Sequence, residues 1–326
     1  MKKILSFISI LAICGSAFGE DLYKANGKKV TTGDLAPKDK LKLNEAEQEI
    51  YQVKSRIVDE ILLDNYFAEL AKKKNKSLED IQKENLLGGE PSEGELKKFY
   101  EENKARIPYP FDQVKPQLTE YVKQQKVQEK REKLLTKIKK EQGFQLLLAA
   151  PVAPKIEIET KGFASRGKDG AKVTVVEFAD FRCGHCKEAS VAFKKLYKDF
   201  EKDVQFVFID FPIIKGSEEI AKGSHCAAEQ NKYWEFHEFA YDNQGSKDVE
   251  QAATIAKKVS LDEGKFKQCM GDKKAEDLVA KGKAEGEKVG VKGTPTIFIN
   301  GKHYMNHPTY EGLSEAIKLA LKGGNS

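Results

Sequence analysis

Two cysteines separated by two residues form the clearest chemical motif in the chain, Cys183-Gly184-His185-Cys186. The residues before the motif, Val173 to Phe178, are mostly β-branched or aromatic and predict a strand, and the residues after it have helical periodicity. Cys183 is therefore expected to lie at the start of a helix. Unpaired backbone N–H groups and the helix dipole favour a thiolate there, so we expect the pKa of Cys183 to lie below the usual value of about 8.5.

This spacing suits thiol–disulfide exchange. A thiolate is the species that attacks disulfides, and two intervening residues let the sulfurs of Cys183 and Cys186 meet across one helical turn. We expect Cys183 to be the nucleophile, Cys186 to resolve the mixed disulfide, and His185 to stabilise the thiolate by charge or a hydrogen bond. A zinc site would need a second pair of ligands at similar spacing, which the sequence lacks, and a static structural disulfide is the other alternative. We expect no metal and no cofactor.

The elements around the motif indicate a parallel α/β unit. A second apolar strand, Val204 to Ile209, follows one helix after the motif, and this strand–helix–strand order places the motif at the carboxyl edge of a sheet. Far downstream, Gly293-Thr294-Pro295-Thr296 enters another apolar strand that ends at an Asn-Gly turn. Residues 217–289 between these pieces have the periodicity of inserted helices.

Together these pieces resemble the thioredoxin superfamily, and within it the periplasmic thiol-disulfide oxidoreductases of the DsbA/DsbC type. The resemblance covers about residues 160–326 and implies an α/β thioredoxin-like fold with a helical insertion over about 217–289. The inserted segment contains a Cys, Glu-Gln, Trp and His run similar to that of DsbA-like proteins.

The resemblance also implies roles for individual residues. Cys183 matches the exposed nucleophile and Cys186 its buried partner. Pro295 matches a cis proline opposite the cysteines, and backbone groups of Thr294 would pair with an extended client. Glu177 matches an acid beneath the active site that helps to move the proton of Cys186, whereas without the resemblance it reads as a surface residue of an edge strand.

The motif departs from the usual DsbA sequence, which carries Cys-Pro-His-Cys and usually valine before the cis proline. Gly184 and Thr294 are more like the corresponding residues of eukaryotic disulfide isomerases and DsbC. Such loop residues tune thiolate stability, and about 30 mV corresponds to roughly 1.4 kcal/mol for a two-electron couple. The sequence therefore leaves oxidase, isomerase and reductase open.

A second pair of cysteines, Cys226 and Cys269, lies on two different predicted helices of the insertion. In an oxidising compartment we expect a structural bridge between them, worth about 3–4 kcal/mol by loop entropy. A second redox relay or two buried free thiols are the alternatives.

The first half of the chain is predicted to be helical over residues 20–150. Ile50, Val53, Ile57 and Ile61, and then Phe67 and Leu70, form an apolar stripe at helical spacing, and Asn44 with Glu47 is typical of a helix start. Ser77 with Asp80, and Ser92 with Glu95, repeat that start signal, and a last helix is expected over about 111–141. Packing within a bundle explains most of the stripe, and exposed apolar grooves would be the functional remainder.

This half resembles the N-terminal helical domain of SurA-like periplasmic chaperones and their parvulin relatives. The matching features are an early turn, a long helix, a Pro-Ser-Glu-Gly-Glu-Leu segment and a helix start, at 26–31, 45–74, 91–104 and 111–115 respectively. In that family the domain binds unfolded chains, so the resemblance implies a client-holding surface.

The first residues are typical of a secretory signal peptide over residues 1–19, with Lys2 and Lys3, an apolar run from Ile4 to Ile13, and small residues before the expected cut. A membrane helix is excluded because the run is too short to cross about 30 Å of hydrocarbon. Leu11-Ala12-Ile13-Cys14 resembles a lipobox, although Ile13 does not suit one, so lipidation of Cys14 stays an alternative.

The composition agrees with two folded domains. The chain has 326 residues, of which 40% are hydrophobic, and Lys plus Arg number 56 against 51 Asp plus Glu, so that nothing indicates a disordered protein or a nucleic-acid-binding tail. Pro151-Val152-Ala153-Pro154 should break the last helix. We expect a signal peptide at 1–19, a SurA-like helical domain at 20–150, a linker at 151–161 and the thioredoxin-like domain at 162–326.

The sequence thus predicts an exported, periplasmic thiol-disulfide oxidoreductase whose N-terminal helices hold an unfolded client while Cys183 exchanges disulfides with it. Its expected partners are unfolded or disulfide-containing proteins and a redox partner protein, with no nucleic acid, and a homodimer through the N-terminal domain is left open. The alternative is a redox-inactive chaperone whose thioredoxin-like half is a docking scaffold.

Overall fold

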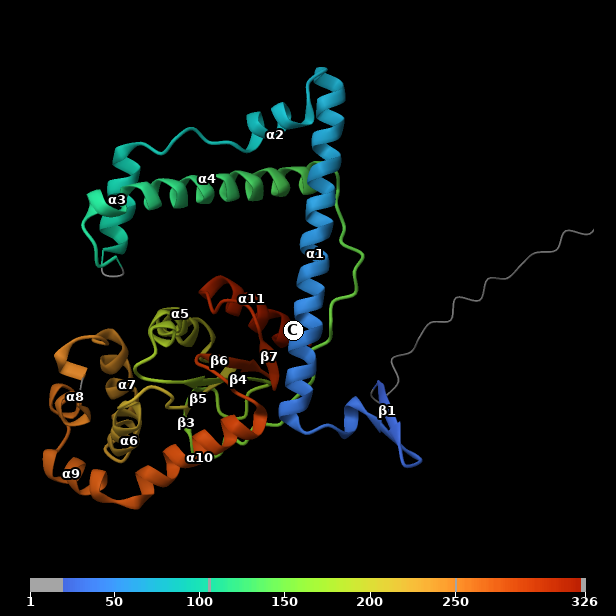
Figure 1. Ribbon diagram of the computed structural model, residues 1–326. Helices are drawn as coiled ribbons and strands as arrows, with labels where there is room; N and C mark the ends of the chain where they lie inside the picture. The colour runs from blue at the N-terminus through green and yellow to red at the C-terminus, as the bar shows by residue number, and fades with distance from the viewer. Residues whose placement is uncertain (1–19, 105–106, 250, 324–326) are drawn as a thin grey trace, which may run out of the picture. The chain divides into compact units, whose positions relative to one another are not determined.

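The computed structural model describes residues 20–104, 107–249 and 251–323, and the chain divides into two compact units (Figure 1). The helical unit is Glu47–Pro151, and the sheet unit contains the described residues up to Ala46 and those from Val152 onward. The predicted signal peptide and Cys14 lie outside the described residues. Within the described part of the chain, no helix is both long enough and apolar enough to cross a membrane.

The helical unit contains most of α1 (Pro37–Lys74) together with α2 (Leu78–Leu86), α3 (Glu93–Asn103) and α4 (Phe111–Glu141). The last of these matches the helix predicted over 111–141. Two separate apolar clusters hold the unit together: Leu63, Phe67, Ala71, Ile81 and Ile138 form one, and Leu96, Tyr100, Leu118 and Val122 form the other.

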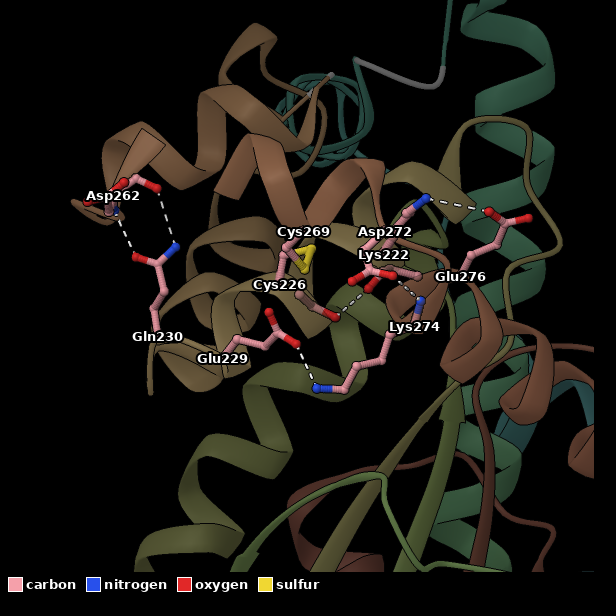
Figure 2. The surroundings of a disulfide bond; sticks show 11 residues. Lys222, Cys226, Glu229, Gln230, Asp262, Cys269, Asp272, Lys274 and Glu276 are labelled. Carbon is pink, nitrogen blue, oxygen red and sulfur yellow. Dashed lines mark hydrogen bonds and ion pairs between the residues drawn. A yellow bond between two sulfur atoms is a disulfide. The ribbon is translucent and has the colours of Figure 1, made fainter. Parts of the chain in front are cut away.

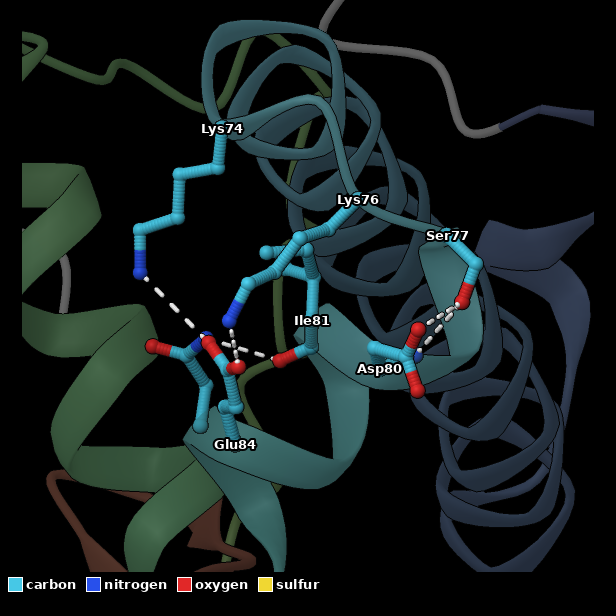
Figure 3. Close-up of polar contacts among 7 residues, drawn as sticks. Lys74, Lys76, Ser77, Asp80, Ile81 and Glu84 are labelled. Carbon is cyan, nitrogen blue, oxygen red and sulfur yellow. Dashed lines mark hydrogen bonds and ion pairs between the residues drawn. The ribbon is translucent and has the colours of Figure 1, made fainter.

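The start signals at Ser77 and Ser92 are confirmed. The Ser77 hydroxyl accepts a hydrogen bond from the backbone N–H of Asp80 at the start of α2, and Lys74 and Lys76 both pair with Glu84 on the same short helix (Figure 3). At the start of α3, Ser92 and Glu95 form the reciprocal capping box. These side chains satisfy N–H groups that a helix leaves free in its first turn.

The start of α1 differs from the expected one. The helix begins at Pro37, seven residues before Asn44, because proline at the first helical position already has a helical φ and its missing N–H is not needed there. Asn44 therefore lies within the helix, where it is buried, and Leu41 packs in the core of the sheet unit with Val289 and Phe298. Core packing of this first turn outweighs the capping signal at Asn44.

The apolar stripe of α1 is only partly packed. Ile50, Val53, Ile57 and Ile61 have exposed fractions of 54%, 39%, 49% and 53%, whereas Phe67 is fully buried. The expectation that packing within a bundle explains most of the stripe is therefore wrong for its first part. Four large aliphatic side chains in helical register remain in contact with solvent.

A short hairpin precedes the helices, in a stretch where no strand was predicted. It consists of β1 (Asp21–Ala25) and β2 (Lys28–Thr31), joined by Asn26 and Gly27, and a 3-10 turn, η1 (Thr32–Asp34), follows it. Both turn residues have positive φ, at 50° and 76°, which is the geometry that an Asn-Gly pair favours between antiparallel strands.

The sheet unit is built on five strands in the order β3-β5-β4-β6-β7. Their bounds are β3 (Ala164–Gly167), β4 (Val173–Ala179), β5 (Val204–Asp210), β6 (Thr296–Ile299) and β7 (Lys302–Tyr304). Strands β4 and β5 are parallel and the other neighbours are antiparallel. The predicted strand–helix–strand crossover is therefore present, and β4 lies in the middle of the sheet with both edges paired.

Helices cover both faces of this sheet. Val173 and Val175 point to the face that packs against α5 (Gly184–Phe200) and α11 (Tyr310–Leu321). Val176 and Phe178 point to the opposite face, where they pack with Val289 of α10 (Lys273–Val289). Side chains alternate between faces along a strand, so Glu177 lies on the same face as Val175, on the α5 side.

The insertion between β5 and β6 is helical, as predicted for 217–289. It contains α6 (Ser217–Ala228), α7 (Tyr233–Asp242), η2 (Lys247–Val249), α8 (Ala252–Lys258), α9 (Glu263–Gly271) and α10. A disulfide joins Cys226 on α6 to Cys269 on α9, with the two Cα atoms 5.6 Å apart (Figure 2). Both cysteines of the bridge are buried.

Candidate redox site

The Cys-Gly-His-Cys motif lies where β4 has ended and α5 begins. Cys183 is the N-cap residue of α5, its carbonyl accepts the backbone N–H of Lys187 at 3.1 Å, and Cys186 lies in the first turn. Both thiols are free, and Cys186 is fully buried whereas Cys183 retains 8% exposure. Of the two cysteines, Cys183 is the less buried.

The loop before β6 faces the motif. The peptide bond between Thr294 and Pro295 is cis, and the thiol of Cys183 donates to the carbonyl oxygen of Thr294 at 3.2 Å. Strand β6 is the antiparallel neighbour of β4, with Thr296 opposite Phe178, and this pairing brings the start of β6 to the end of β4. Residues more than a hundred positions apart are in this way placed around one sulfur.

The pKa of Cys183 is lowered to about 5, well below the ordinary range of a thiol. The largest cause is a hydrogen bond from the side chain of Cys186 to the Cys183 sulfur, followed by Thr294 and by the backbone N–H groups of Cys186 and His185, while burial acts in the opposite direction. The sulfur thus receives the free N–H groups of a helix start, as the sequence predicted. Cys183 is a thiolate at neutral pH.

The pKa of Cys186 is shifted in the opposite direction. Burial raises its pKa far above the ordinary range, and the nearby Cys183 sulfur and the Glu177 carboxylate raise it further. The shifts of the two pKa values therefore favour a thiolate on Cys183 and a protonated thiol on Cys186. The proton of Cys186 must leave whenever the disulfide is formed and return whenever the disulfide opens.

Glu177 is buried in the middle of the sheet. It pairs in register with Phe208 of β5 and Ile297 of β6, and only 4% of it is exposed. Burial raises the pKa of its carboxyl to about 8, and the positive charge of Arg166 acts against that shift. A carboxyl with such a pKa exchanges protons near neutral pH and lies close enough to Cys186 to influence its titration.

His185 is exposed, and its imidazole Nδ1 lies 3.3 Å from Oε2 of Glu188. Its backbone N–H is the group that acts on the Cys183 sulfur. The structure thus places the peptide of His185 at the nucleophile and its ring at the surface.

Three further residues of the site had not been recognised in the sequence. The first is Asp180, which is buried directly after β4. Its carboxylate accepts hydrogen bonds from the backbone N–H of Arg182, Ile213 and Ile214 at 2.7, 2.7 and 2.9 Å, and from the Ser217 hydroxyl at 2.5 Å. It therefore ties the motif loop to the loop between β5 and α6. An acid soon after a predicted strand, just before the cysteine motif, was the signal that could have found it.

The second is Arg166 on β3. The register places Glu177 opposite Phe208 and Phe208 opposite Ala164, so that Arg166, two residues further along β3, points to the same face of the sheet as Glu177. Its guanidinium carbon lies 3.2 Å from the ring centre of Tyr197 and 4.2 Å from that of Trp234, and Nη1 donates to Glu238 at 2.9 Å. These rings hold a positive charge beside the buried acid.

The third is Gln244, in the turn after α7. Its side-chain amide donates to the carbonyl oxygens of Phe181 and Cys183, at 2.9 and 3.0 Å. These hydrogen bonds join the helical insertion directly to the motif loop.

Comparisons with known proteins indicate the family of the chain. A family model described as thioredoxin matches residues 159–319. The chain is 34% identical to a probable disulfide bond formation protein D of Bacillus cereus, over 48% of this chain and 78% of the relative, and 32% identical to disulfide bond formation protein D of Bacillus subtilis, over 50% and 79%. The solved structure of oxidised BdbD from Bacillus subtilis aligns with a TM-score of 0.47 and 31% identity, over 53% of this chain and all of that chain.

Other relatives are longer proteins that share only this part. The chain is 29% identical over 161 residues to a Na(+)/H(+) antiporter NhaA 1 of Salinispora arenicola, and it spans only 24% of that relative's length. The relatives that the chain covers over most of their length are the disulfide bond formation proteins. The chain therefore belongs to the thioredoxin-like, DsbA-type family of disulfide oxidoreductases.

Proposed function

We propose that the protein is an exported, periplasmic thiol-disulfide oxidoreductase that forms, isomerises or reduces disulfides in unfolded client proteins. The observation that supports this most directly is the pair of free cysteines at the start of α5, whose thiol pKa values are shifted in opposite directions, down for Cys183 and up for Cys186. The disulfide bond formation proteins among its relatives support the same reaction class. Export rests on the signal-peptide pattern of residues 1–19.

Among the three directions, the low pKa of Cys183 favours oxidation of the client. A stabilised thiolate lowers the free energy of the reduced protein relative to its disulfide, which makes the disulfide a stronger oxidant. A client thiolate attacks Sγ of Cys183 in the Cys183–Cys186 disulfide, that S–S bond breaks, and Cys186 leaves and takes up a proton. A second client thiolate then attacks the mixed disulfide and releases the Cys183 thiolate.

In this cycle the client loses two electrons and gains a disulfide, and the protein becomes a dithiol. A redox partner protein that carries its own disulfide accepts the two electrons and restores the Cys183–Cys186 bond. Glu177 supplies the proton to Cys186 as it leaves and accepts it again on reoxidation, since its carboxyl titrates close to neutral pH. Arg166 keeps part of that carboxyl ionised by opposing the effect of burial.

The client chain is proposed to bind in two places. Near the motif, backbone groups of Thr294 before Pro295 pair with an extended client segment. In the helical unit, the exposed stripe Ile50, Val53, Ile57 and Ile61 offers an apolar surface to an unfolded chain, in line with the resemblance of this half to SurA-like chaperone domains. The same stripe is the surface that a homodimer of the N-terminal half would use.

The proposed reaction is tested by mixing oxidised protein with a reduced, unfolded disulfide protein without oxygen and counting client thiols with time. We expect stoichiometric loss of two client thiols per protein molecule and no loss with Cys183→Ser. When Cys186→Ser is mixed instead with a disulfide-bonded client, the Cys183 thiolate should attack the client disulfide, release one client thiol and remain trapped as a mixed disulfide on non-reducing gels. A redox-inactive holdase would instead suppress client aggregation equally well with Cys183→Ala and would consume no client thiols. That result would refute the proposal.

A further inference from the structure

The insertion returns to the redox site immediately after α7. Helix α7 ends at Asp242, and Asn243 caps it by donating from its side-chain amide to the carbonyl of Phe239 at 2.9 Å. The next residue, Gln244, turns away from its own helix. Its side-chain nitrogen donates to the carbonyl oxygens of Phe181 and Cys183, and its own carbonyl oxygen accepts the Nζ of Lys187 at 3.0 Å.

These contacts involve the residues before and after the nucleophile Cys183. Phe181 lies two residues before Cys183, and Lys187 lies one helical turn after it. The carbonyl of Cys183 already accepts the N–H of Lys187, so the Gln244 amide occupies its second acceptor position. The peptide groups that determine where the Cys183 sulfur lies are thereby fixed from the inserted domain.

Apolar contacts support the same attachment. The ring of Phe181 lies 5.2 Å from that of Tyr241 and 5.6 Å from that of His237, both in the last turns of α7. The last residue of α7, Asp242, is paired with Lys194 of α5. The end of α7 is therefore held against the motif by packing and by an ion pair, and Gln244 projects from a rigidly placed segment.

We propose that Gln244 is a positioning residue for Cys183, through which the helical insertion sets the stability of the Cys183 thiolate and so the oxidising strength of the site. The positive end of its amide dipole lies beside the start of α5, where backbone N–H groups already stabilise the sulfur. It also keeps the carbonyl oxygen of Cys183 hydrogen-bonded. The inference deepens the proposed function, since it names what tunes the reaction at the same cysteine.

The other charged and titratable groups near this loop stay the same in the variants below, so that differences between variants report on residue 244. They lie on α5, β4, the motif loop, β3 and α7: Cys186, His185, Lys187, Glu188, Lys194, Glu177, Asp180, Arg182, Arg166, Glu238, His237, Tyr241 and Asp242.

The test compares Gln244→Leu and Gln244→Glu with a matched control, Asn243→Leu. The control removes an amide of the same turn that donates to the carbonyl of Phe239 in its own helix. The rate of alkylation of Cys183 by iodoacetamide is measured against pH, with the modified site read by mass spectrometry, and the dithiol–disulfide equilibrium is measured against glutathione. Thermal melting by circular dichroism checks that each variant is folded.

We expect Gln244→Glu to raise the pH midpoint of Cys183 alkylation by about one unit, because it places a negative charge beside the thiolate, and to weaken the oxidising equilibrium by about tenfold. Gln244→Leu should act in the same direction, by a factor of roughly three in the acid dissociation constant of Cys183 and in the oxidising equilibrium constant. Asn243→Leu should leave both constants unchanged. Should Gln244→Glu fail to fold, Gln244→Leu alone decides.

The inference would be overturned if the alkylation midpoint and the glutathione equilibrium of the Gln244 variants equal those of the wild type. It would also be overturned if the Asn243 control shifts them equally. Because the alkylation midpoint is read without a client, it tests Gln244 even if the client reaction of the proposed function is absent. A protein that exchanges no disulfide with a client in any direction but shows the Gln244 shift would refute the proposed function and leave the inference standing.

Discussion

The thiolate of Cys183 should make the stability of the reduced protein depend on pH in a defined window. The pKa is about 5 in the folded protein against 9.0 for an unperturbed cysteine. Because the folded value is the lower one, the stabilisation is complete above pH 9 and disappears as the pH falls through 5. At pH 7 the two units between the folded pKa and the solution pH correspond to about 2.7 kcal/mol, and at pH 4 the contribution is close to zero.

The sulfur lies near the surface, so solvent screening reduces this figure to about 2 kcal/mol. The measurement is denaturant unfolding of the reduced protein at pH 4 and pH 7, with and without Cys183→Ser. Carboxylates elsewhere in the chain also titrate across this range, but they cancel in the difference between the two proteins. We expect the serine variant to lose about 2 kcal/mol more relative to the wild type at pH 7 than at pH 4.

The oxidised protein is the control, since it holds no thiolate and its stability should lack this component. If the difference between wild type and Cys183→Ser is the same at both pH values to within about 0.5 kcal/mol, then the helix start and Cys186 do not stabilise the thiolate. The protein would then have no stabilised thiolate to favour oxidation of the client.

Three further outcomes follow from the structure. Glu177→Gln should stabilise the protein by about 2–3 kcal/mol at pH 7 and by little at pH 4, because burial raises the pKa of this carboxyl from 4.5 to about 8 and so destabilises the fold as the pH rises above 4.5. An equal gain in stability at both pH values would contradict this explanation. The same variant should slow release of Cys186 in single-turnover assays. Replacing Cys226 and Cys269 by alanine should cost about 3–4 kcal/mol in denaturant unfolding while leaving the Cys183 alkylation midpoint unchanged, and a shifted midpoint would show that the bridge acts on the redox site. Ile57→Ser with Ile61→Ser should reduce suppression of client aggregation in light scattering and change the unfolding free energy by less than about 0.5 kcal/mol, whereas a large loss of stability would show that the stripe is packed.

The elements whose signals are local were predictable from the sequence. The two parallel strands, the helix after the motif, the inserted helices and the last helix of the N-terminal half each depend on periodicity within one segment. The start of α1 was not predictable in this way. Asn44 and Glu47 form a good capping signal, but Leu41 packs with Val289 and Phe298, which lie far along the chain, and that packing extends the helix back to Pro37.

The burial of single residues could not be predicted from local sequence patterns. Glu177 in a β-branched strand is compatible with an edge or a central strand, and only the order of the five strands puts it in the middle, where its pKa rises. The reverse holds for Ile50, Val53, Ile57 and Ile61, whose periodicity predicted a packed face that the structure leaves exposed. Periodicity reports which residues share a face, whereas burial depends on what lies against that face.

Two of the three residues that were missed at the redox site share a physical reason. Asp180 and Gln244 act mainly on backbone groups, the N–H of Arg182, Ile213 and Ile214 and the carbonyls of Phe181 and Cys183. Every residue type supplies such groups, so the partner leaves no trace in the sequence, and Gln244 lies 61 residues after Cys183. A cysteine pair can be found by its side chains, but the strength of its thiolate depends on peptide groups that distant side chains hold in place. Related proteins with the same motif can therefore differ in oxidising strength through the loop after α7.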